Sequence, residues 1–252
     1  MRVGIFPNLV KRECAVIVQQ LIEICQKHNI AYYLPAYVSE SCQPLYQRIG
    51  AEHLRSHMTM YRSIDVAMVL GGDGTILKMA KQFAETGIPI CGVNLGSLGF
   101  LYEVETETLE KRILDIMQGH YFIEERMMLQ GVIYDEDGVV QSLPVALNDI
   151  VIAHGNVGKL IRVDMSINGH FVQQYPGDGI IVSTATGSTG YTFSSGGPIV
   201  SPKVKCIMVT PVCPHLLLKV PLVLSDPDQT SFSIGHSRNG VRVSVDGMMD
   251  QE

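Results

Sequence analysis

The sequence predicts two domains: an α/β domain with a Rossmann-like parallel sheet over residues 1–120, then an all-β, β-sandwich-like domain over residues 121–252. Three observations favour this fold class. Short apolar runs alternate with segments of helical period in the first part of the chain, as in a sheet whose strands are joined by helices. These runs contain few polar residues, which is typical of strands buried on both faces. After residue 121, short strand-like runs lie between Pro and Gly turns.

Strand and helix candidates alternate along the first domain. The strand candidates are continuously apolar, and they are Val3–Phe6, Ile30–Leu34, Asp65–Leu70 and Ile88–Val93. The first helix candidate, Cys14 to Asn29, has apolar residues at helical spacing. A second runs from Ile76 to Ala84, and a third, Thr106 to Met117, starts with acidic residues and is followed by Gly119. The polar segment from Pro35 to Arg62 is interpreted only loosely, as a loop or a loop with a helix.

The second domain consists of hairpin and strand signals. Gln130–Tyr134 and Val139–Leu143 flank an acidic turn that ends at Gly138, which predicts a hairpin. Apolar residues alternate from Ile161 to Ile167 and lead into Asn168-Gly169, the strongest short hairpin signal. Further short strand candidates are Ile207–Val212, Val220–Leu224, Phe232–Ile234 and Val241–Val245. Because no long helical pattern occurs here, we predict an all-β domain.

The composition excludes several function classes. The chain has 252 residues, 17% of them charged, and a net charge of −6, so it lacks the basic surface that nucleic acids or anionic membranes require. None of the six cysteines is spaced as C-x-x-C, and no apolar run approaches the ~18 residues of a membrane span. We therefore expect a cytoplasmic protein with neither nucleic acid nor membrane as a partner.

A glycine-rich loop, Gly71-Gly72-Asp73-Gly74-Thr75, joins a predicted strand to a predicted helix. Unpaired amides and the positive end of the helix dipole attract phosphate at such a position. The loop matches neither G-x-x-x-x-G-K-[ST] nor G-x-G-x-x-G. Asp73 is unusual in an anion cradle, and it has two interpretations. It accepts a proton from an alcohol during phosphoryl transfer, or it caps a helix that begins at Thr75 or Ile76. The five residues alone favour the two about equally.

Two further segments are candidates for a binding site. The stretch from Gly177 to Pro198 opens from an apolar strand, Ile180–Val182, into glycine and hydroxyl residues that suit a polar ligand with ribose hydroxyls. Tyr191 in this stretch is placed to stack on a base. By composition alone, a turn-rich β connection is the stronger interpretation. Asn148-Asp149 interrupts a long apolar run, which indicates a bulge, a site or a buried polar pair.

Taken together, these motifs resemble those of the NAD kinases. The loop at residues 71–75, the Asn94-Leu95-Gly96 and Leu98-Gly99-Phe100-Leu101 pair, Asn148-Asp149, and residues 177–198 occur in that family's order. The resemblance covers nearly the whole chain. The loop alone is shared with lipid kinases, whereas its combination with Asn148-Asp149 and Thr186-Gly187-Ser188-Thr189-Gly190-Tyr191 is far more specific.

The resemblance implies phosphorylation of NAD to NADP, with ATP as donor, Mg²⁺ alongside it, and Asp73 as the base at the 2′-hydroxyl of the adenosine ribose. It implies that Gly71, Gly72, Gly74 and Thr75 offer amides to phosphates. Lys78, one helical turn beyond the loop, has two interpretations, a phosphate contact or a solvated lysine. The implied NAD contacts are Asn148, Asp149, Lys159, Asp178, Thr189, Gly190, Tyr191, Thr192, Phe193 and Ser194. No protein metal site is expected. The family is usually oligomeric through its β domain, so a homo-oligomer, dimer or tetramer, is expected.

The chain departs from the family pattern at several positions. Asn148-Asp149 stands where Asn-Glu is common, and Pro176 stands where many bacterial relatives carry arginine. Ala185 and Gly190 replace a usual proline and alanine, and Met248 replaces a common glutamine. Two rival functions keep part of the pattern. A lipid or sugar kinase has no use for Asn148-Asp149, and a non-catalytic dinucleotide sensor has no use for Asp73.

Overall fold

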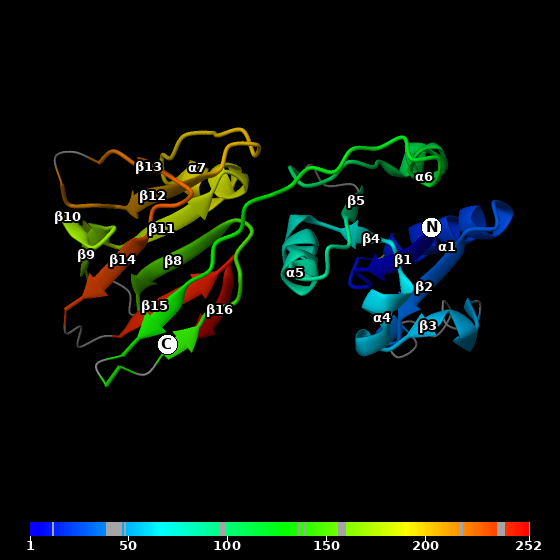
Figure 1. Cartoon of the computed structure of the whole chain (residues 1–252), viewed down its shortest axis with the longest axis horizontal. Coiled ribbons are helices and arrows are strands. Elements are labelled where there is room, and N and C mark those ends of the chain that lie inside the picture. The colour runs from blue at the N-terminus through cyan, green and yellow to red at the C-terminus, as the bar shows by residue number, and fades with distance from the viewer. Residues whose placement is uncertain are drawn as a thin grey trace. The chain divides into compact units, whose positions relative to one another are not determined.

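The computed structural model describes residues 1–11, 13–38, 47, 49–95, 99–135, 137–138, 140–155, 160–216, 219–235 and 240–251. The chain divides into one unit over Met1–Ile123 and another over Glu124–Glu252 (Figure 1). The change in composition near residue 120 lies close to this division.

A parallel sheet forms the centre of the first unit. Its strands are β1 (Arg2–Pro7), β2 (Ala31–Pro35), β3 (Leu54–Arg55), β4 (Val66–Gly71) and β5 (Ile90–Asn94), in the order β3-β2-β1-β4-β5. Every pairing is parallel, with Val3 opposite Val66 between β1 and β4 and Ala67 opposite Ile90 between β4 and β5. The predicted α/β fold is therefore confirmed.

Helices cover both faces of this sheet. They are α1 (Cys14–Lys27), α4 (His57–Ser63), α5 (Asp73–Phe83) and α6 (Leu109–Met117), with short 3₁₀ turns η1 (Ala51–His53) and η2 (Thr106–Thr108). Apolar residues of α1 and α6 pack with alternate residues of β4, namely Val66, Met68 and Leu70. The intervening residues, Ala67 and Val69, pack with α4 and α5 on the other face. This double burial explains why the strands read as unbroken apolar runs.

The loosely assigned segment from Pro35 to Arg62 contains regular structure within its described residues. β3 adds to the sheet edge through Leu34, which lies opposite Leu54, and α4 places Met60 in the core. The two-residue β3 is too short to give a periodic signal, so its position depends on pairing with β2.

Two antiparallel sheets build the second unit. The larger contains β13 (Leu222–Ser225), β12 (Cys206–Val212), β11 (Gly179–Thr184), β8 (Asp149–His154), β15 (Val241–Val245) and β16 (Met248–Gln251), in that order. The smaller contains β10 (His170–Gly177), β9 (Ile161–Ile167) and β14 (Thr230–Ile234). A hairpin of β6 (Val132–Tyr134) and β7 (Val140–Ser142) precedes them, as the sequence predicts.

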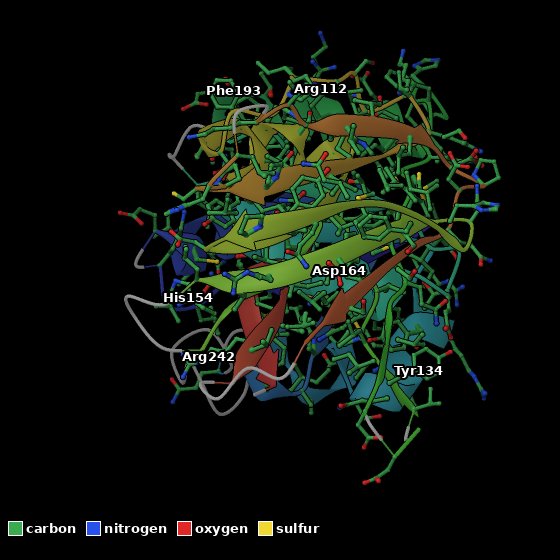
Figure 2. All side chains as sticks on the ribbon, turned by 90° about the vertical axis from the view of Figure 1, so that its left-hand side faces the viewer. Arg112, Tyr134, His154, Asp164, Phe193 and Arg242 are labelled. Carbon is green, nitrogen blue, oxygen red and sulfur yellow. The ribbon has the colours of Figure 1, made fainter. Side chains whose placement is uncertain are left out.

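The core of the second unit lies between its two sheets. Val163 and Met165 of β9 are fully buried and pack with Ile150, Ile180 and other residues of the larger sheet. Asp164, between them in sequence, lies on the opposite face of the smaller sheet and accepts a hydrogen bond from Gln174 (Figure 2). The predicted β-rich, sandwich-like class is confirmed.

The structure corrects the prediction for Asn148 and Asp149. The apolar run around them is not one continuous strand, because β8 begins at Asp149 and Asn148 lies just before it. No register shift is recorded within β8 and its pairings to β11 and β15. The carboxylate of Asp246 accepts hydrogen bonds from the amides of residues 147 and 148, and Thr184, the last residue of β11, donates to both of their carbonyls. The two polar residues therefore mark a strand start rather than a bulge.

Candidate functional site

A cavity lies at the carboxyl ends of β1 and β4 in the first unit. The strand order reverses between these two strands, because β1 continues to β2 on one side and β4 continues to β5 on the other. Ligands of open α/β sheets bind at such switch points. The cavity has a volume of about 910 Å³. Residues from three loops and two helices line it, among them Asn8, Lys11, Tyr37, Tyr61, Gly72, Asp73, Gly74, Thr75, Lys78 and Gln82.

The charge of this cavity favours an anion. Its lining contains two lysines, Lys11 and Lys78, and one carboxylate, Asp73, although the whole chain carries a net charge of −6. The hydroxyl of Tyr37 donates to the carbonyl of Pro7 at 3.2 Å, and burial raises the pKa of Tyr37 to about 12. This phenol is therefore a fixed, neutral part of the wall.

The glycine-rich loop is organised by Thr75. Gly72 precedes the first residue of α5 and is its N-cap, and its N–H donates to Thr75 Oγ1 at 3.3 Å. The amide of Thr75 donates back to the Gly72 carbonyl at 2.6 Å. Asn8, from the loop after β1, donates through Nδ2 to Thr75 Oγ1 at 3.0 Å. A Cβ on Gly71 would overlap this hydroxyl, so Gly71 permits the close approach of the threonine.

Asp73 is not the helix cap, which corrects the capping interpretation. α5 begins at Asp73 itself, three residues before the predicted start at Ile76. The carboxylate accepts hydrogen bonds from the backbone amides of Phe100, at 3.1 Å to Oδ2, and Leu101, at 3.4 Å to Oδ1. A Cβ on Gly99 would lie 2.5 Å from Asp73 Oδ1. A segment that follows β5 therefore orients this carboxylate.

Tyr102 lies beside the same carboxylate. Its hydroxyl is buried without a hydrogen-bond partner among the described residues. Burial, and after it the negative charge of Asp73, holds the pKa of Tyr102 well above its usual range. The phenol therefore keeps its proton and remains able to donate it to a ligand atom.

In the second unit, the structure brings Asn148 and Asp149 next to the turn η3 (Thr186–Thr189) and the short helix α7 (Tyr191–Ser194). A Cβ on Gly190 would lie 3.5 Å from Asn148 Nδ2 and 3.9 Å from Asp149 Oδ2. Asn148 Oδ1 is buried without a hydrogen-bond partner in the described part of the chain. A buried oxygen of this kind needs a hydrogen-bond donor, which a ligand or an ordered water can supply.

Tyr191 and Asp178 belong to the same neighbourhood. Tyr191 is 46% exposed as a whole residue, so part of its side chain is accessible for stacking. Burial is the main cause that raises the pKa of Tyr191, and the charges of Cys213, Asp178 and Asp149 raise it further. The backbone carbonyl of Asp178 accepts a hydrogen bond from the amide of His154 at 3.1 Å.

The other residues predicted to contact NAD differ in how exposed their side chains are. Thr192 is fully buried and donates to Ser183 Oγ at 2.7 Å, so its side chain anchors α7 to the sheet. Phe193 is 54% exposed (Figure 2), and Ser194 is also exposed. The hydroxyl of Thr189 lies 3.5 Å from the carbonyl of Thr186. Lys159, like Gly96 and Leu98 of the motif after β5, lies outside the described residues.

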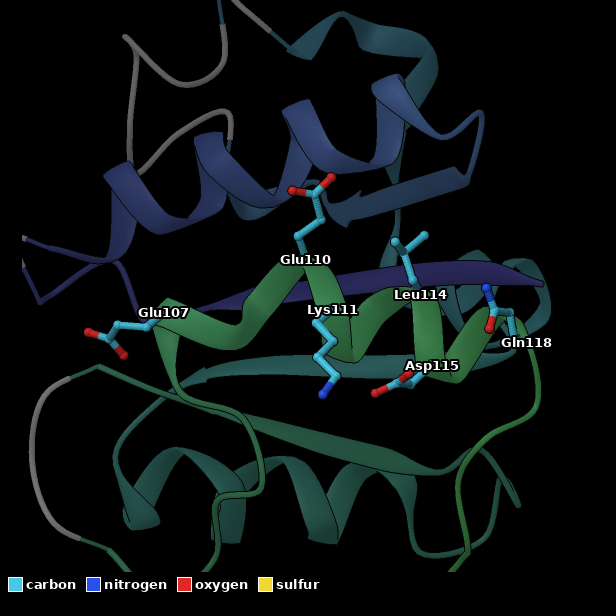
Figure 3. A pocket seen from close by; sticks show the side chains of 6 residues that line it. All are labelled: Glu107, Glu110, Lys111, Leu114, Asp115 and Gln118. Carbon is cyan, nitrogen blue, oxygen red and sulfur yellow. The ribbon is translucent and has the colours of Figure 1, made fainter.

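A second hollow, of about 540 Å³, lies along α6 and is lined by Glu107, Glu110, Lys111, Leu114, Asp115 and Gln118. These side chains leave a single stretch of chain in different directions rather than converging (Figure 3). Three of the six are acidic, and Glu110 is already paired with Lys27 and His28, each at 2.7 Å. The hollow is unsuited to a phosphate. Among the described residues, no group of three or more His, Cys, Asp or Glu side chains is arranged to hold a metal ion.

Comparison with known proteins identifies the family. The model of the ATP-NAD kinase N-terminal domain matches residues 3–121, and that of the ATP-NAD kinase C-terminal domain matches residues 147–252. The chain belongs to the NAD kinase family. The predicted activity, ATP-dependent phosphorylation of NAD, is thereby confirmed at the level of the family.

Relatives and solved structures agree with this family. The chain is 37% identical to the NAD kinase of Natranaerobius thermophilus, over 97% of this chain and 83% of that protein. It is 38% identical to the NAD kinase of Lachnoclostridium phytofermentans, over 98% of this chain and 85% of that protein. The match to a crystal structure of yeast NADH kinase complexed with NADH covers 100% of this chain and 76% of that chain. Its TM-score is 0.89 and the sequence identity is 28%. The match to a crystal structure of an NAD kinase from Archaeoglobus fulgidus in complex with ATP covers 98% of this chain and 84% of that chain. Its TM-score is 0.75 and the sequence identity is 25%.

The structure adds several residues to the cavity around Asp73 and to the surroundings of Asn148 that were not predicted as site residues from the sequence. Asn8 and Lys11 belong to the first through a loop that carries no motif, and Tyr102 directly follows the Leu98–Leu101 motif but was not itself a predicted site residue. Asp246 and Thr184 bond to the backbone around Asn148 in the second. The Asp246-Gly247 pair falls where NAD kinases have a similar segment and also has the signal of a two-residue hairpin turn, but neither feature says which residues its carboxylate binds. In the described part of the chain, no helix has the length and apolar character needed to span a membrane.

Proposed function

We propose that the chain transfers the terminal phosphoryl group of ATP to the 2′-hydroxyl of the adenosine ribose of NAD, with Asp73 as general base. One observation carries this proposal: the Asp73 carboxylate lies in a phosphate-type loop and is oriented by the amides of Phe100 and Leu101 instead of capping its helix. In the reaction, the 2′-oxygen forms a bond to the γ-phosphorus while its proton passes to Asp73. The bond from the γ-phosphorus to the bridging oxygen breaks, and ADP leaves with the electron pair.

On the donor side, the loop amides divide into two groups. Those of Gly72 and Thr75 are engaged within the loop, and Gly71 belongs to β4. The first-turn amides of Asp73 and Gly74 are therefore the ones we assign to the phosphates. Lys78 lines the same cavity and contributes positive charge.

On the acceptor side, we assign NAD to the neighbourhood of Asn148 and Asp149. Asn148 Oδ1, buried and without a described partner, accepts from the adenosine, and the exposed ring of Tyr191 stacks on its base. Asp178 contacts the nicotinamide half, and Thr189, Gly190, Phe193 and Ser194 complete the wall. Thr192 acts indirectly, through its bond to Ser183. Lys159 remains an expected dinucleotide contact.

We also propose that Mg²⁺ accompanies ATP. The described residues supply no cluster of ligands for a resident ion, and Mg²⁺ typically binds through substrate phosphates and one or two carboxylates. Asp73 is the carboxylate that lines the cavity at the loop. When bound, the ion neutralises charge on the phosphates.

The test is to incubate the purified chain with NAD, ATP and Mg²⁺ and to detect NADP with an NADP-specific dehydrogenase. We expect NADP to form and EDTA to abolish the activity. A folded chain that forms no NADP contradicts the proposal. A parallel reaction with NADH measures whether the reduced dinucleotide is also accepted, a comparison prompted by the match to an NADH kinase.

We further propose a cytoplasmic homo-oligomer formed through the second unit. Its surface exposes large apolar side chains on β10, with Phe171 at 66% and Val172 at 43%. The described cysteines are all free thiols, which suits a reducing compartment. Size-exclusion chromatography with light scattering measures the subunit number, and a monomer at micromolar concentration contradicts the oligomer.

A further inference from the structure

The segment Leu147–Asp149, which ends at the first residue of β8, has all of its backbone polar groups hydrogen-bonded to two other residues, Asp246 and Thr184. Its three amides donate to one carboxylate, that of Asp246. Leu147 N lies 3.1 Å from Oδ2, and the amides of Asn148 and Asp149 lie 2.8 and 3.1 Å from Oδ1. Consecutive amides that converge in this way form an anion-binding concavity, and here a side chain of the chain itself fills it.

The carbonyls of the same segment are equally engaged. Thr184 donates its hydroxyl to Leu147 O at 2.6 Å and its amide to Asn148 O at 2.9 Å. The amide of Asp246 donates to Asp149 O at 2.9 Å. The backbone from 147 to 149 is therefore held from both sides, so it cannot rotate without breaking several bonds.

Asp246 fills this role from a hairpin turn. With Gly247 it forms the two-residue connection between β15 and β16, and both residues have positive φ, +51° and +72°. Such a turn needs Asp, Asn or Gly for its backbone alone, and the side chain then faces solvent. Asp246 is instead only 9% exposed and its carboxylate binds the amides of β8. The turn geometry therefore does not account for this carboxylate.

Fixing this backbone fixes where the side chain of Asn148 projects. Its Oδ1 is buried without a described partner, and its Nδ2 lies beside Gly190. A Cβ on Gly187 would overlap the Asn148 carbonyl, so the η3 turn packs tightly against the same segment. Small changes of the backbone dihedral angles at residue 148 would move the side-chain carboxamide of Asn148 away from a ligand.

We propose that Asp246 is a positioning residue for the adenosine half of the dinucleotide: it holds the Asn148–Asp149 backbone so that these side chains meet the ligand. The proposal rests on the proposed NAD contacts of Asn148 and Asp149. Asp246 itself does not touch the substrate.

The primary test is Asp246→Asn in the full chain. The variant keeps one oxygen acceptor and places an NH₂ donor against at least one backbone amide. Loss of a charged acceptor should raise the Kd for NAD about tenfold or more by calorimetry. The KM for ATP and kcat at saturating NAD should stay within about threefold, because the lost NAD contact stabilises the bound ground state and the transition state equally. An unchanged Kd, or a loss of kcat without a change in Kd, overturns the proposal.

A matched control separates positioning from general stabilisation. Asp228 is also a turn carboxylate of this unit and accepts bonds from Ser225 N, Ser225 Oγ and Asn168 Nδ2, at 3.1, 2.7 and 2.8 Å. Asp228→Asn should lower the melting temperature without moving the Kd for NAD. If both variants raise that Kd equally, the effect is one of stability and the proposal is wrong.

A double-mutant cycle tests the route of action. If Asp246 acts through Asn148, its substitution must cost less NAD affinity in an Asn148→Ala background than in the wild type. Fully multiplicative effects on the Kd contradict this route.

If Asp246→Asn does not fold, Thr184→Val replaces it. This near-isosteric change removes the hydroxyl that donates to Leu147 O at 2.6 Å and accepts from the amide of Gly187 at 3.1 Å. It should also weaken NAD binding, and an unchanged Kd in the folded variant overturns the proposal. Failure of the proposed NAD kinase activity can be told apart from failure of the Asp246 proposal, because in the first case the wild-type chain itself forms no NADP.

Discussion

Replacement of Asp73 by Asn separates catalysis from stability. Asn preserves the shape of the side chain, but it accepts bonds with one oxygen instead of two. It retains one of the bonds from Phe100 and Leu101, of 3.1 and 3.4 Å, and loses the other. One lost hydrogen bond costs about 0.5–1.5 kcal/mol, and loss of negative charge at the first residue of α5 costs about 0.3–1 kcal/mol. We expect destabilisation of about 1–2 kcal/mol in total.

The expected loss of activity is far larger than this destabilisation can produce. A domain with a typical stability of about 5–15 kcal/mol remains folded at 25 °C after such a loss. Removal of a general base lowers kcat by about 10²–10⁴. Steady-state kinetics, with melting monitored by circular dichroism, should therefore show collapsed kcat, a melting temperature lower by a few degrees and a nearly unchanged KM for NAD.

Asp65→Asn is the matched control for this experiment. Asp65 is another hydrogen-bonded carboxylate of the first unit, paired with Arg2 at 2.7 Å just before β4, whereas Asp73 follows the other end of that strand. Its substitution should leave kcat unchanged. If kcat of Asp73→Asn stays within about threefold of the wild type, Asp73 is not the base and the mechanism is wrong.

Three further outcomes follow from individual contacts. Gly99→Ala should lower kcat by about tenfold or more with a smaller change in KM, because its Cβ would lie 2.5 Å from Asp73 Oδ1 and displace the carboxylate; wild-type kcat would refute this. Tyr191→Ala should weaken NAD binding by about 1 kcal/mol through loss of ring stacking, without unfolding the chain. If calorimetry shows an unchanged affinity for NAD, Tyr191 does not stack on the base and is only a residue of the turn. The hydrogen bond from Arg2 lowers the pKa of Asp65, so its stabilising effect is present above the unfolded pKa of about 3.9 and is lost as the pH falls below it. Acid unfolding should therefore depend less on pH in Asp65→Asn than in the wild type, and identical acid titrations by circular dichroism would contradict this.

The sequence by itself determined the elements and the motifs. Unbroken apolar runs and helical periods report burial, which is a local property of each segment, and they located β1, α1, β4 and α6 within a few residues. Turn chemistry is also local, so Asn168-Gly169 marked its hairpin, where both residues have positive φ. The glycine-rich loop by itself indicated only a phosphate site, and its combination with Asn148-Asp149 and residues 186–191 indicated phosphorylation of NAD.

Only the tertiary structure decided how the functional side chains are held. Asp73 and the amide of Phe100 are 27 residues apart, and Asn148 and Asp246 are 98 apart. These partners meet because of strand order and register, which no local period encodes. The same reason explains the two corrections. Asp73 does not cap α5, because its carboxylate accepts from the distant amides of Phe100 and Leu101. β8 begins at Asp149 because Asp246 and Thr184 hold the backbone that precedes it.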